Sequence, residues 1–276
     1  MYLSQIDEWI YLALKEDIGS GDVTTQSIIS PTSISSGKLI AKEQLIVCGL
    51  AVVKRIFELI DSRIQLDCLV GDGDSVNQGD ILALVKGPSQ GILAGERTAL
   101  NILQRLSGVS TKTRQAVQEI EGTNAVIVDT RKTTPGMRIL EKYAVKTGGG
   151  TNHRTGLYDG ILIKDNHIQA AGSITAAIHN ARRHTHHLLK IEIEVENFAQ
   201  LKEALEANAD IIMLDNMSVA DMAEAVRIVN GRALTEASGN MGEYNLKKVA
   251  ETGVNLISIG SLTHSARAMD ISLRFD

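Results

Sequence analysis

One stretch of the sequence, residues 129–167, carries a high density of side chains that can bind an anion. Seven Lys or Arg residues stand there against four carboxylates, an excess of about three positive charges, whereas the whole chain has a formal net charge of −5 at pH 7. A polyanion such as DNA usually requires a domain that is basic throughout. The local excess therefore predicts a small anionic ligand.

Ionisable and small residues recur wherever an apolar run of the second half ends. Cations follow the first two runs, carboxylates the next two, and small residues the last two. In chain order these groups are Arg131 and Lys132, Lys164, Glu194 and Glu196, Asp215, Ser238-Gly239, and Gly260-Ser261. If the apolar runs are parallel strands of one barrel, all these groups meet at its C-terminal mouth.

Each of these groups favours a different ligand. Guanidinium groups grip planar carboxylates at two points, so Arg131 with Thr130, His153 and Arg154 suits a carboxylate. Glu194 and Asp215 could hold Mg²⁺, which prefers one or two carboxylates together with phosphate oxygens. Glycine and serine loops at the last two strands present backbone N–H groups to a phosphate. The sequence therefore predicts a pair of substrates rather than one metabolite.

The elements that position these residues alternate regularly beyond residue 124. Short apolar runs predict strands at 125–130, 160–165, 190–196, 210–216, 233–238 and 255–261. Amphipathic segments predict helices near 135–146, with Pro135 in the first turn, and near 173–183, 198–207, 218–230 and 244–252. Strands separated by helices imply βαβ units and a parallel sheet. Six strands are fewer than eight, so we expect an incomplete or modified barrel.

The first half predicts an α+β domain. A helix capped by Ser4 precedes a Ser/Thr/Pro-rich loop, strands are expected over 38–50 and within 66–87, and a helix covers 51–61. The loop after residue 70, GDGDSVNQGD, has three aspartates and no lysine, so we interpret it as a turn and not as a phosphate loop. A helical pattern over 92–121 is expected to break near Ser107-Gly108.

Composition excludes several classes of function. Aromatic residues make up 3% of the chain, too few for the stacking platforms that bind single-stranded nucleic acid. No apolar run approaches the ~20 residues of a membrane helix, and the acidic, amphipathic start does not have the layout of a signal peptide. Cys48 and Cys68 stand in apolar runs without metal or redox spacing, so we expect a buried, reduced pair in the cytoplasm.

Some of the candidate residues have structural interpretations that the pattern alone leaves open. Glu192, Glu194 and Glu196 alternate on one strand, so they share a face and one or two of them could be structural. Lys164 could equally be an ion-pair partner within the barrel. The run HTHH (184–187) is interpreted as a solvated helix end rather than a metal cluster. Arg97, alone on a helix, would by itself be a surface residue.

The order of the motifs resembles that of the quinolinate phosphoribosyltransferase family. The segments that carry the resemblance are ALKEDIGSGDVTT, ERTALNILQRLSG (96–108), DTRKTTPGMRILEKYAVKTGGGTNHR (129–154), LIKDNHI (162–168), IEVE (193–196), LDN (214–216), EASGN (236–240) and ISIGSLTHS (257–265). One departure is Asn240, where a second glycine is frequent in the family. Asn tolerates left-handed backbone angles, so we expect the loop to keep its shape.

The resemblance implies an enzyme of NAD biosynthesis, in the cytoplasm. Quinolinate and phosphoribosyl pyrophosphate would give nicotinate mononucleotide, pyrophosphate and CO2, with Mg²⁺. It implies an α/β-sandwich N-terminal domain (1–108) and an incomplete, six- or seven-stranded parallel α/β barrel (109–276), whose last residues could return to the first domain. It also implies a homodimer or higher homo-oligomer in which Arg97 is supplied across the interface.

The resemblance also assigns roles to individual residues. Arg97, Arg131, His153, Arg154 and Lys164 would bind the quinolinate carboxylates, with Thr130 beside them and Lys132 between the two substrates. Glu194 and Asp215 would serve the ribose hydroxyls and the metal pyrophosphate. Ser238-Gly239-Asn240 and Ile259-Gly260-Ser261 would take the 5′-phosphate. The catalytic residues would be Lys132, Lys164, Glu194 and Asp215.

Three other functions stay open. A ModD-like paralogue shares the scaffold and acts on a different substrate, although the complete set of cations favours quinolinate. A barrel lyase would use Lys164 as a Schiff base. A metabolite sensor without catalysis would not need both the acidic and the basic sets.

Overall fold

The computed structural model describes residues 6–276, which form two compact units. The first contains residues up to Arg114 together with Pro135–Gly148 and Ala266–Asp276, and the second contains Gln115–Thr134 and Gly149–Ser265. The proposed capping residue Ser4 lies outside the described residues. Within the described part of the chain, no helix is long and apolar enough to cross a membrane.

The first unit is built on a four-stranded antiparallel sheet with the order β12-β1-β5-β3. These strands are β1 (Ile34–Ala41), β3 (Gln65–Cys68), β5 (Ile81–Pro88) and β12 (Ile271–Phe275), and a separate pair joins β2 (Leu45–Ile46) to β4 (Ser75–Val76). The helices are α1 (Asp7–Ile18), α2 (Val23–Ile28), α3 (Leu50–Ile60) and α5 (Arg138–Thr147), with most of α4 (Ser89–Glu119). Burial alternates along the second half of β1, the pattern of a sheet with one face on a core.

The GDGD loop is the turn that its composition predicted. Asp72 accepts hydrogen bonds from the backbone N–H groups of Gly49 and Leu50 at 3.0 and 3.1 Å, and so caps the start of α3. Asp74 accepts from the N–H of Gly71 at 2.8 Å. These two aspartates thus accept hydrogen bonds from backbone N–H groups, as expected of turn residues.

The predicted break near Ser107-Gly108 is wrong, because α4 runs without interruption from Ser89 to Glu119. A Cβ at position 108 would lie 1.9 Å from the carbonyl oxygen of Arg267. The glycine is therefore explained by the close approach of another backbone segment and not by a turn.

The second unit is a curved parallel sheet of six strands in the order β6-β11-β10-β9-β8-β7. All six predicted strands are present: β6 (Val126–Val128), β7 (Ile161–Ile163), β8 (Ile191–Val195), β9 (Ile211–Asp215), β10 (Leu234–Ser238) and β11 (Leu256–Ser258). The first strand of the series pairs with the last, so the sheet curls into a barrel that stays open between β6 and β7. This confirms the predicted fold class.

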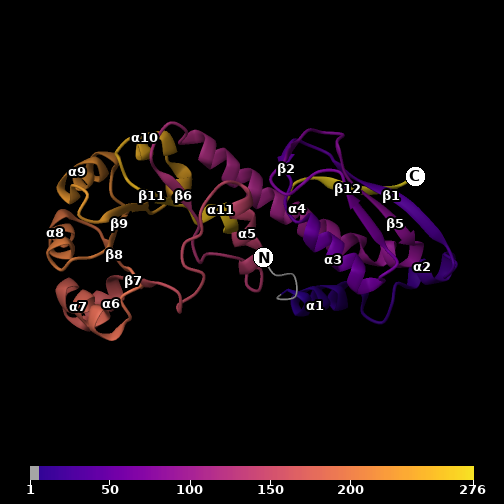
Figure 1. Cartoon of the computed structure of the whole chain (residues 1–276), viewed down its shortest axis with the longest axis horizontal. Coiled ribbons are helices and arrows are strands. Elements are labelled where there is room, and N and C mark those ends of the chain that lie inside the picture. The colour runs from indigo at the N-terminus through magenta and orange to yellow at the C-terminus, as the bar shows by residue number, and fades with distance from the viewer. Residues whose placement is uncertain (1–5) are drawn as a thin grey trace. The chain divides into compact units, whose positions relative to one another are not determined.

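Helices line the outside of this sheet, as Figure 1 shows for α7 to α10. They are α6 (Asp165–Ala171), α7 (Ile174–His184), α8 (Phe198–Glu206), α9 (Val219–Val229) and α10 (Leu246–Ala250). The short α11 (Ser261–His264) lies instead at the strand ends, where Thr263 bonds to the loop after β6. Ser173, Asn197, Ser218 and Asn245 each accept a backbone N–H bond as N-caps. Short polar side chains thus start four of the helices.

Three smaller predictions and one unpredicted helix complete the comparison with the structure. Helix α5 begins at Arg138 rather than near Pro135, because Gly136 takes a left-handed φ of 81° in a turn. Helix α6 was not predicted. Cys48 is buried but Cys68 is exposed, so the expected buried pair is wrong. His184, His186 and His187 are exposed at the C-terminal end of α7, as expected for a solvated helix end.

Candidate active site

A cavity of about 510 Å³ lies at the C-terminal ends of the six parallel strands. It brings together most of the residues that the sequence singled out, although they come from loops and strands far apart in the chain. The predicted residues that line it are Thr130, Arg131, Lys132, His153, Arg154, Lys164, Glu194, Asp215, Ser238, Gly239 and Asn240. Leu162, Met213, Asn216, Glu236 and Ser258 complete the lining.

Arg131, Lys132 and Lys164 enter this cavity from the ends of the two short edge strands, and Arg154 enters it from the loop before β7. Hydrogen bonds that hold the loop after β6 include those from the Lys132 N–H to the Thr130 hydroxyl at 3.0 Å and from the Thr263 hydroxyl to the Lys132 carbonyl at 2.7 Å. Lys164 directly follows β7, and its ammonium group pairs with the Glu194 carboxylate. Lys164 is thus an ion-pair partner, as its structural interpretation predicted, and it also lines the cavity.

Arg154 stands in a crowded positive environment. Its Nη1 donates to the carbonyl of Gly160 at 3.0 Å. Burial, and after it the positive charge of Arg131, lower the pKa of the Arg154 guanidinium from its ordinary value, against the smaller opposing effects of Glu192 and Asp159. A bound anion would relieve this repulsion, so the pair of arginines favours a negatively charged ligand.

The carboxylates face the cations from the neighbouring strands β8 and β9. The Glu194 side chain is 14% exposed. Burial, and after it the negative charge of Glu194, raise the pKa of Asp215, whose Oδ2 accepts a 2.7 Å hydrogen bond from the Asn216 amide. Two carboxylates that repel each other in a partly buried cavity fit a divalent cation, which would remove the repulsion.

The small-residue loop after β10 has a backbone that only glycine can adopt at one position. Gly239 has a φ of +93°, and a Cβ there would lie 2.2 Å from the Asn216 Oδ1 and 2.8 Å from its backbone nitrogen. Asn240 takes the left-handed φ of 49°, which confirms that asparagine accommodates the backbone of this loop. The loop can therefore bring main-chain N–H groups close to an anion.

The remaining predicted residues lie outside the cavity lining. Ile259, Gly260 and Ser261 directly follow the lining residue Ser258, and a Cβ on Gly260 would lie 3.0 Å from the Lys132 Cδ. Arg97 is exposed on α4 and belongs to the first unit, whereas every residue that lines the cavity belongs to the second.

Sequence patterns gave no role to two carboxylates, Glu192 on β8 and Glu236 on β10. Glu192 is 4% exposed and Glu236 is fully buried. Both stand in apolar strands at positions that point into the barrel, and a carboxylate at such a position is the signal that could have identified them. Of the three alternating glutamates, Glu192 is buried, Glu194 lines the cavity and Glu196 is exposed, so each has a different environment.

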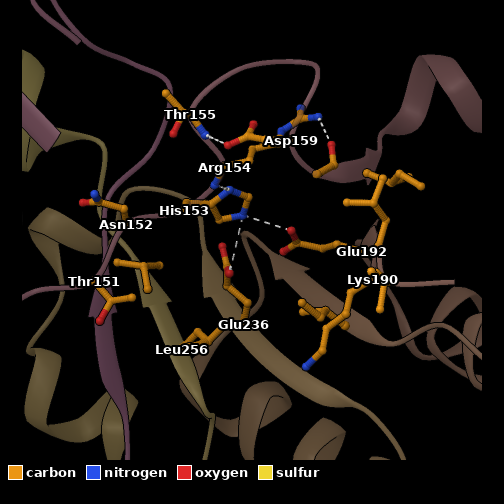
Figure 2. Close-up of a pocket in the computed structure, with 16 residues that line it drawn as sticks. Thr151, Asn152, His153, Arg154, Thr155, Asp159, Lys190, Glu192, Glu236 and Leu256 are labelled. Atoms are coloured by element: carbon orange, nitrogen blue, oxygen red, sulfur yellow. Dashed lines mark hydrogen bonds and ion pairs between the residues drawn. The ribbon is translucent and has the colours of Figure 1, made fainter. Parts of the chain in front are cut away.

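These two carboxylates flank His153 in the wall of a second cavity of about 510 Å³, shown in Figure 2. The Nε2 of His153 lies 2.9 Å from Glu192 Oε2 and 3.8 Å from Glu236 Oε2. Burial first, and the charge of Glu192 second, raise the pKa of Glu236 to about 8, although His153 and Ser258 act in the opposite direction. His153, Arg154 and Glu236 line both cavities and separate them.

Comparison with known proteins agrees with this site. The family described as "Quinolinate phosphoribosyl transferase, C-terminal domain" matches residues 109–274, and its N-terminal counterpart matches residues 22–107. The chain is 47% identical over 258 residues, covering 94% of it and 89% of the relative, to the "Probable nicotinate-nucleotide pyrophosphorylase [carboxylating]" of Bacillus subtilis (strain 168). It is 40% identical to the tobacco (Nicotiana tabacum) "Quinolinate phosphoribosyltransferase [decarboxylating] 1b", over 97% of this chain and 81% of that one.

Solved structures show the same architecture over the whole chain. The nicotinate-nucleotide pyrophosphorylase from Francisella tularensis superposes with a TM-score of 0.96 at 38% identity, covering 100% of this chain and 98% of that chain. NadC from Streptococcus pyogenes superposes with a TM-score of 0.94 at 39% identity, covering 100% and 99%. The N-terminal and C-terminal domains of the family match this chain in the same order, and the relatives are more than 30% identical to it over nearly its full length. The chain therefore belongs to the quinolinate phosphoribosyltransferase family.

Proposed function

We propose that this protein transfers the phosphoribosyl group of phosphoribosyl pyrophosphate to quinolinate, with loss of CO2, to give nicotinate mononucleotide and pyrophosphate for NAD biosynthesis. The observation that carries the proposal is the single cavity that gathers cations, carboxylates and a glycine loop at the ends of successive strands. Each of these three groups matches one part of the substrate pair. The names of the relatives support the same reaction.

The cationic side of the cavity is proposed to bind quinolinate. Arg131, Arg154 and Lys164 supply positive charge to the two carboxylates, with Thr130 and His153 beside them and Lys132 between the substrates. Arg131 disfavours the charge on Arg154, and a dicarboxylate would reverse that effect. Guanidinium groups also fix the plane of a carboxylate, which would aim the pyridine nitrogen at the sugar.

The acidic side is proposed to bind the ribose hydroxyls and the magnesium pyrophosphate. Glu194 and Asp215 are the residues that would hold Mg²⁺, and the raised pKa of Asp215 beside the Glu194 charge is the reason why they fit it. When bound, Mg²⁺ neutralises charge on the departing pyrophosphate. The loops Ser238-Gly239-Asn240 and Ile259-Gly260-Ser261 are proposed to take the 5′-phosphate through main-chain N–H groups.

The chemistry follows from this placement. The pyridine nitrogen forms a bond to C1 of the ribose as the bond from C1 to pyrophosphate breaks, and the leaving group takes the electron pair. The product pyridinium then accepts the electrons of the bond between C2 and the carboxylate carbon, so CO2 leaves and C2 takes a proton. No covalent enzyme nucleophile is required. The protein contributes mainly positioning and complementary charge.

We also propose a homo-oligomer, at least a dimer, in which Arg97 reaches the site of another subunit. Arg97 is exposed on α4 in the first unit, and the cavity is lined by the second. Arg97→Ala and Lys164→Ala should each be nearly inactive. After the two variants are unfolded, mixed and refolded, roughly a quarter of all sites should be intact if the site is shared. No recovery of activity in confirmed heterodimers would contradict the proposal.

A cytoplasmic location remains a prediction. Cys48 and Cys68 are both free, which suits a reducing compartment.

One assay tests the reaction. The protein is incubated with Mg²⁺, phosphoribosyl pyrophosphate and quinolinate labelled with ¹³C in the C2 carboxylate, and the products are separated. Nicotinate mononucleotide should form together with labelled CO2 in equal amounts. Nucleotide that retains the label, or no nucleotide at all, would contradict the proposed function. Borohydride trapping with candidate carbonyl substrates should leave Lys164 unmodified.

A further inference from the structure

Three side chains from three different elements meet beneath the cationic side of the cavity. His153 lies in the segment between α5 and β7, Glu192 on β8 and Glu236 on β10, and one ligand-type atom from each lies within 4.8 Å of the others. The oxygens Oε1 of Glu192 and both Oε atoms of Glu236 are buried and have no hydrogen-bond partner among the described residues. Buried carboxyl oxygens without partners are costly, so the cluster requires an explanation.

The hydrogen bonds determine which nitrogen of His153 carries the proton. The backbone N–H of Arg154 can only donate, and it points at His153 Nδ1 at 2.8 Å. Nδ1 must therefore be the nitrogen without a proton, and the ring proton sits on Nε2. From there it is donated to Glu192 Oε2 at 2.9 Å. The backbone N–H of His153 is held as well, by Asp129 Oδ1 at 2.9 Å.

This arrangement argues against a metal centre, although one histidine and two carboxylates have the composition of one. A metal on Nε2 would need that nitrogen's lone pair, and the ring proton would then move to Nδ1. A protonated Nδ1 would face the Arg154 N–H, which would place two donors against each other. The cluster as folded therefore holds a proton where a metal would sit.

The hydrogen bonds connect Glu192 to the predicted anion-binding residue Arg154 through the ring of His153. Glu192 accepts the hydrogen bond from His153 Nε2, and His153 Nδ1 accepts the backbone N–H of Arg154. The Arg154 guanidinium donates to the Gly160 carbonyl and lines the substrate cavity. A ring turned over about its axis would lose both of its hydrogen bonds. Burial raises the pKa of Glu236 and so favours the uncharged form of this carboxyl beside the histidine.

We propose that Glu192 is a positioning residue: by accepting the Nε2 proton of His153, it holds the ring so that Nδ1 anchors the Arg154 amide and presents Arg154 to an aromatic dicarboxylate. The proposal rests on the proposed function, because it takes quinolinate as the ligand of Arg154. Glu192 does not line the substrate cavity. In this role it acts through its hydrogen bond to His153.

Two variants at the same position test the proposal. In Glu192→Gln the amide oxygen can still accept the Nε2 proton, whereas in Glu192→Leu a side chain of similar size cannot. Glu192→Leu should raise the KM for quinolinate by about tenfold to a hundredfold, the loss expected from a hydrogen bond to a charged group. Its KM for phosphoribosyl pyrophosphate should stay within about twofold of the wild-type value, since Arg154 serves the other substrate. Glu192→Gln should restore the quinolinate KM to within about threefold.

A spectroscopic measurement checks the proton directly and does not depend on activity. In protein labelled with ¹⁵N-histidine, the ring resonances of His153 are identified by their absence in a His153→Gln variant. The wild type and Glu192→Gln should show the Nε2–H tautomer, and Glu192→Leu should show a mixture of tautomers. If the wild type makes no nicotinate mononucleotide, the proposed function fails while the tautomer result still stands.

Several results would overturn the positioning role. One is an unchanged quinolinate KM in a folded Glu192→Leu protein, and another is equal impairment of Glu192→Gln and Glu192→Leu. A parallel rise of both KM values with a lower melting temperature would indicate that Glu192 merely supports the fold. A wild-type His153 spectrum that shifts on addition of stoichiometric Zn²⁺ would favour the metal centre instead.

Discussion

The two charged sides of the cavity are built differently. Arg131, Lys132 and Lys164 follow strands of three residues, β6 and β7, and Arg154 stands in the loop before β7. The Lys164 side chain is 45% exposed. The carboxylates belong to strands of five residues, β8 and β9, and Glu194 is only 14% exposed. Side chains on strands are held more rigidly than those on loops. The cationic side can therefore adapt to its ligand, whereas the acidic side offers a fixed geometry.

The two substrates therefore make different demands on the protein. A planar dicarboxylate needs long side chains that close around it, and a metal pyrophosphate needs oxygens at set positions. The Lys164–Glu194 ion pair links the two sides. If each side serves its own substrate, a substitution on one side should leave binding on the other side largely unchanged.

The largest effect is expected for Asp215→Asn, which removes charge from the rigid side. We expect kcat to fall by about 10²- to 10³-fold, because the departing pyrophosphate loses stabilisation in a partly buried site. The dissociation constant for quinolinate alone should change by less than about twofold, which isothermal titration calorimetry can measure. A large loss of quinolinate affinity with normal dependence on Mg²⁺ would reverse the assignment of the two sides.

A change of substrate probes the adaptable side. Nicotinate has one carboxylate fewer than quinolinate and would leave guanidinium charge unpaired, at a cost of roughly 2–4 kcal/mol. We expect its kcat/KM to be about 30- to 700-fold lower than that of quinolinate, measured with the same purified protein. Comparable turnover of the two acids would show that the cations do not select for two carboxylates.

The loop Ser238-Gly239-Asn240 carries no charge, so the role of its shape is tested by adding a methyl group at Gly239. Gly239→Ala should raise the KM for phosphoribosyl pyrophosphate by about tenfold and lower the free energy of unfolding by ~1–3 kcal/mol, because the new Cβ would overlap Asn216. The matched control is Gly231→Ala, at φ +73° with nothing within 4 Å of the added Cβ. It should show the smaller cost of backbone strain alone and an unchanged KM. Equal effects of the two variants would refute the steric explanation.

The smallest effect concerns the buried carboxyl Glu236 below the two sides. Its folded-state pKa of about 8 lies above the ordinary 4.5, so its bound proton contributes stability that is complete below pH 4.5 and is lost as the pH rises toward 8. Between about pH 7 and pH 8 this group should lower the melting temperature by about 2–4 °C, the shift that ~1 kcal/mol produces in a protein of this size. Glu236→Gln should remove that part of the decrease. A variant with the same pH profile as the wild type would place the pKa outside this range.

The sequence predicted all six parallel strands, because short β-branched runs between amphipathic helices have few alternatives. It also predicted most of the residues that meet in the cavity, since the ends of parallel strands share one edge of a sheet. It did not predict that α4 would continue through Gly108, because the reason is a backbone segment some 160 residues away in the chain. Glycine in a helix looks like a break unless the neighbouring segment is known.

The sequence did not predict the cluster of His153, Glu192 and Glu236, for a related reason. The patterns LTEAS and IEIEV place carboxylates in buried strands but do not reveal that Glu192 and Glu236 converge on one imidazole. The tautomer of His153 depends on the direction of one backbone N–H, which no residue type encodes. Propensity and periodicity describe single elements, whereas this cluster depends on the distance between three of them.

The pairing of β12 with β1 has a consequence for how the protein is made. Residues 37–41 pair with residues 271–275, so the outer strand of the antiparallel sheet comes from the opposite end of the sequence. While the ribosome adds the intervening residues, β1 remains an open edge with unpaired N–H and C=O groups, the kind of edge that recruits foreign strands. The unit whose residues are translated first is therefore the last to be completed. A chain that stalls near residue 270 would display that edge permanently and should be a target of chaperones and proteases.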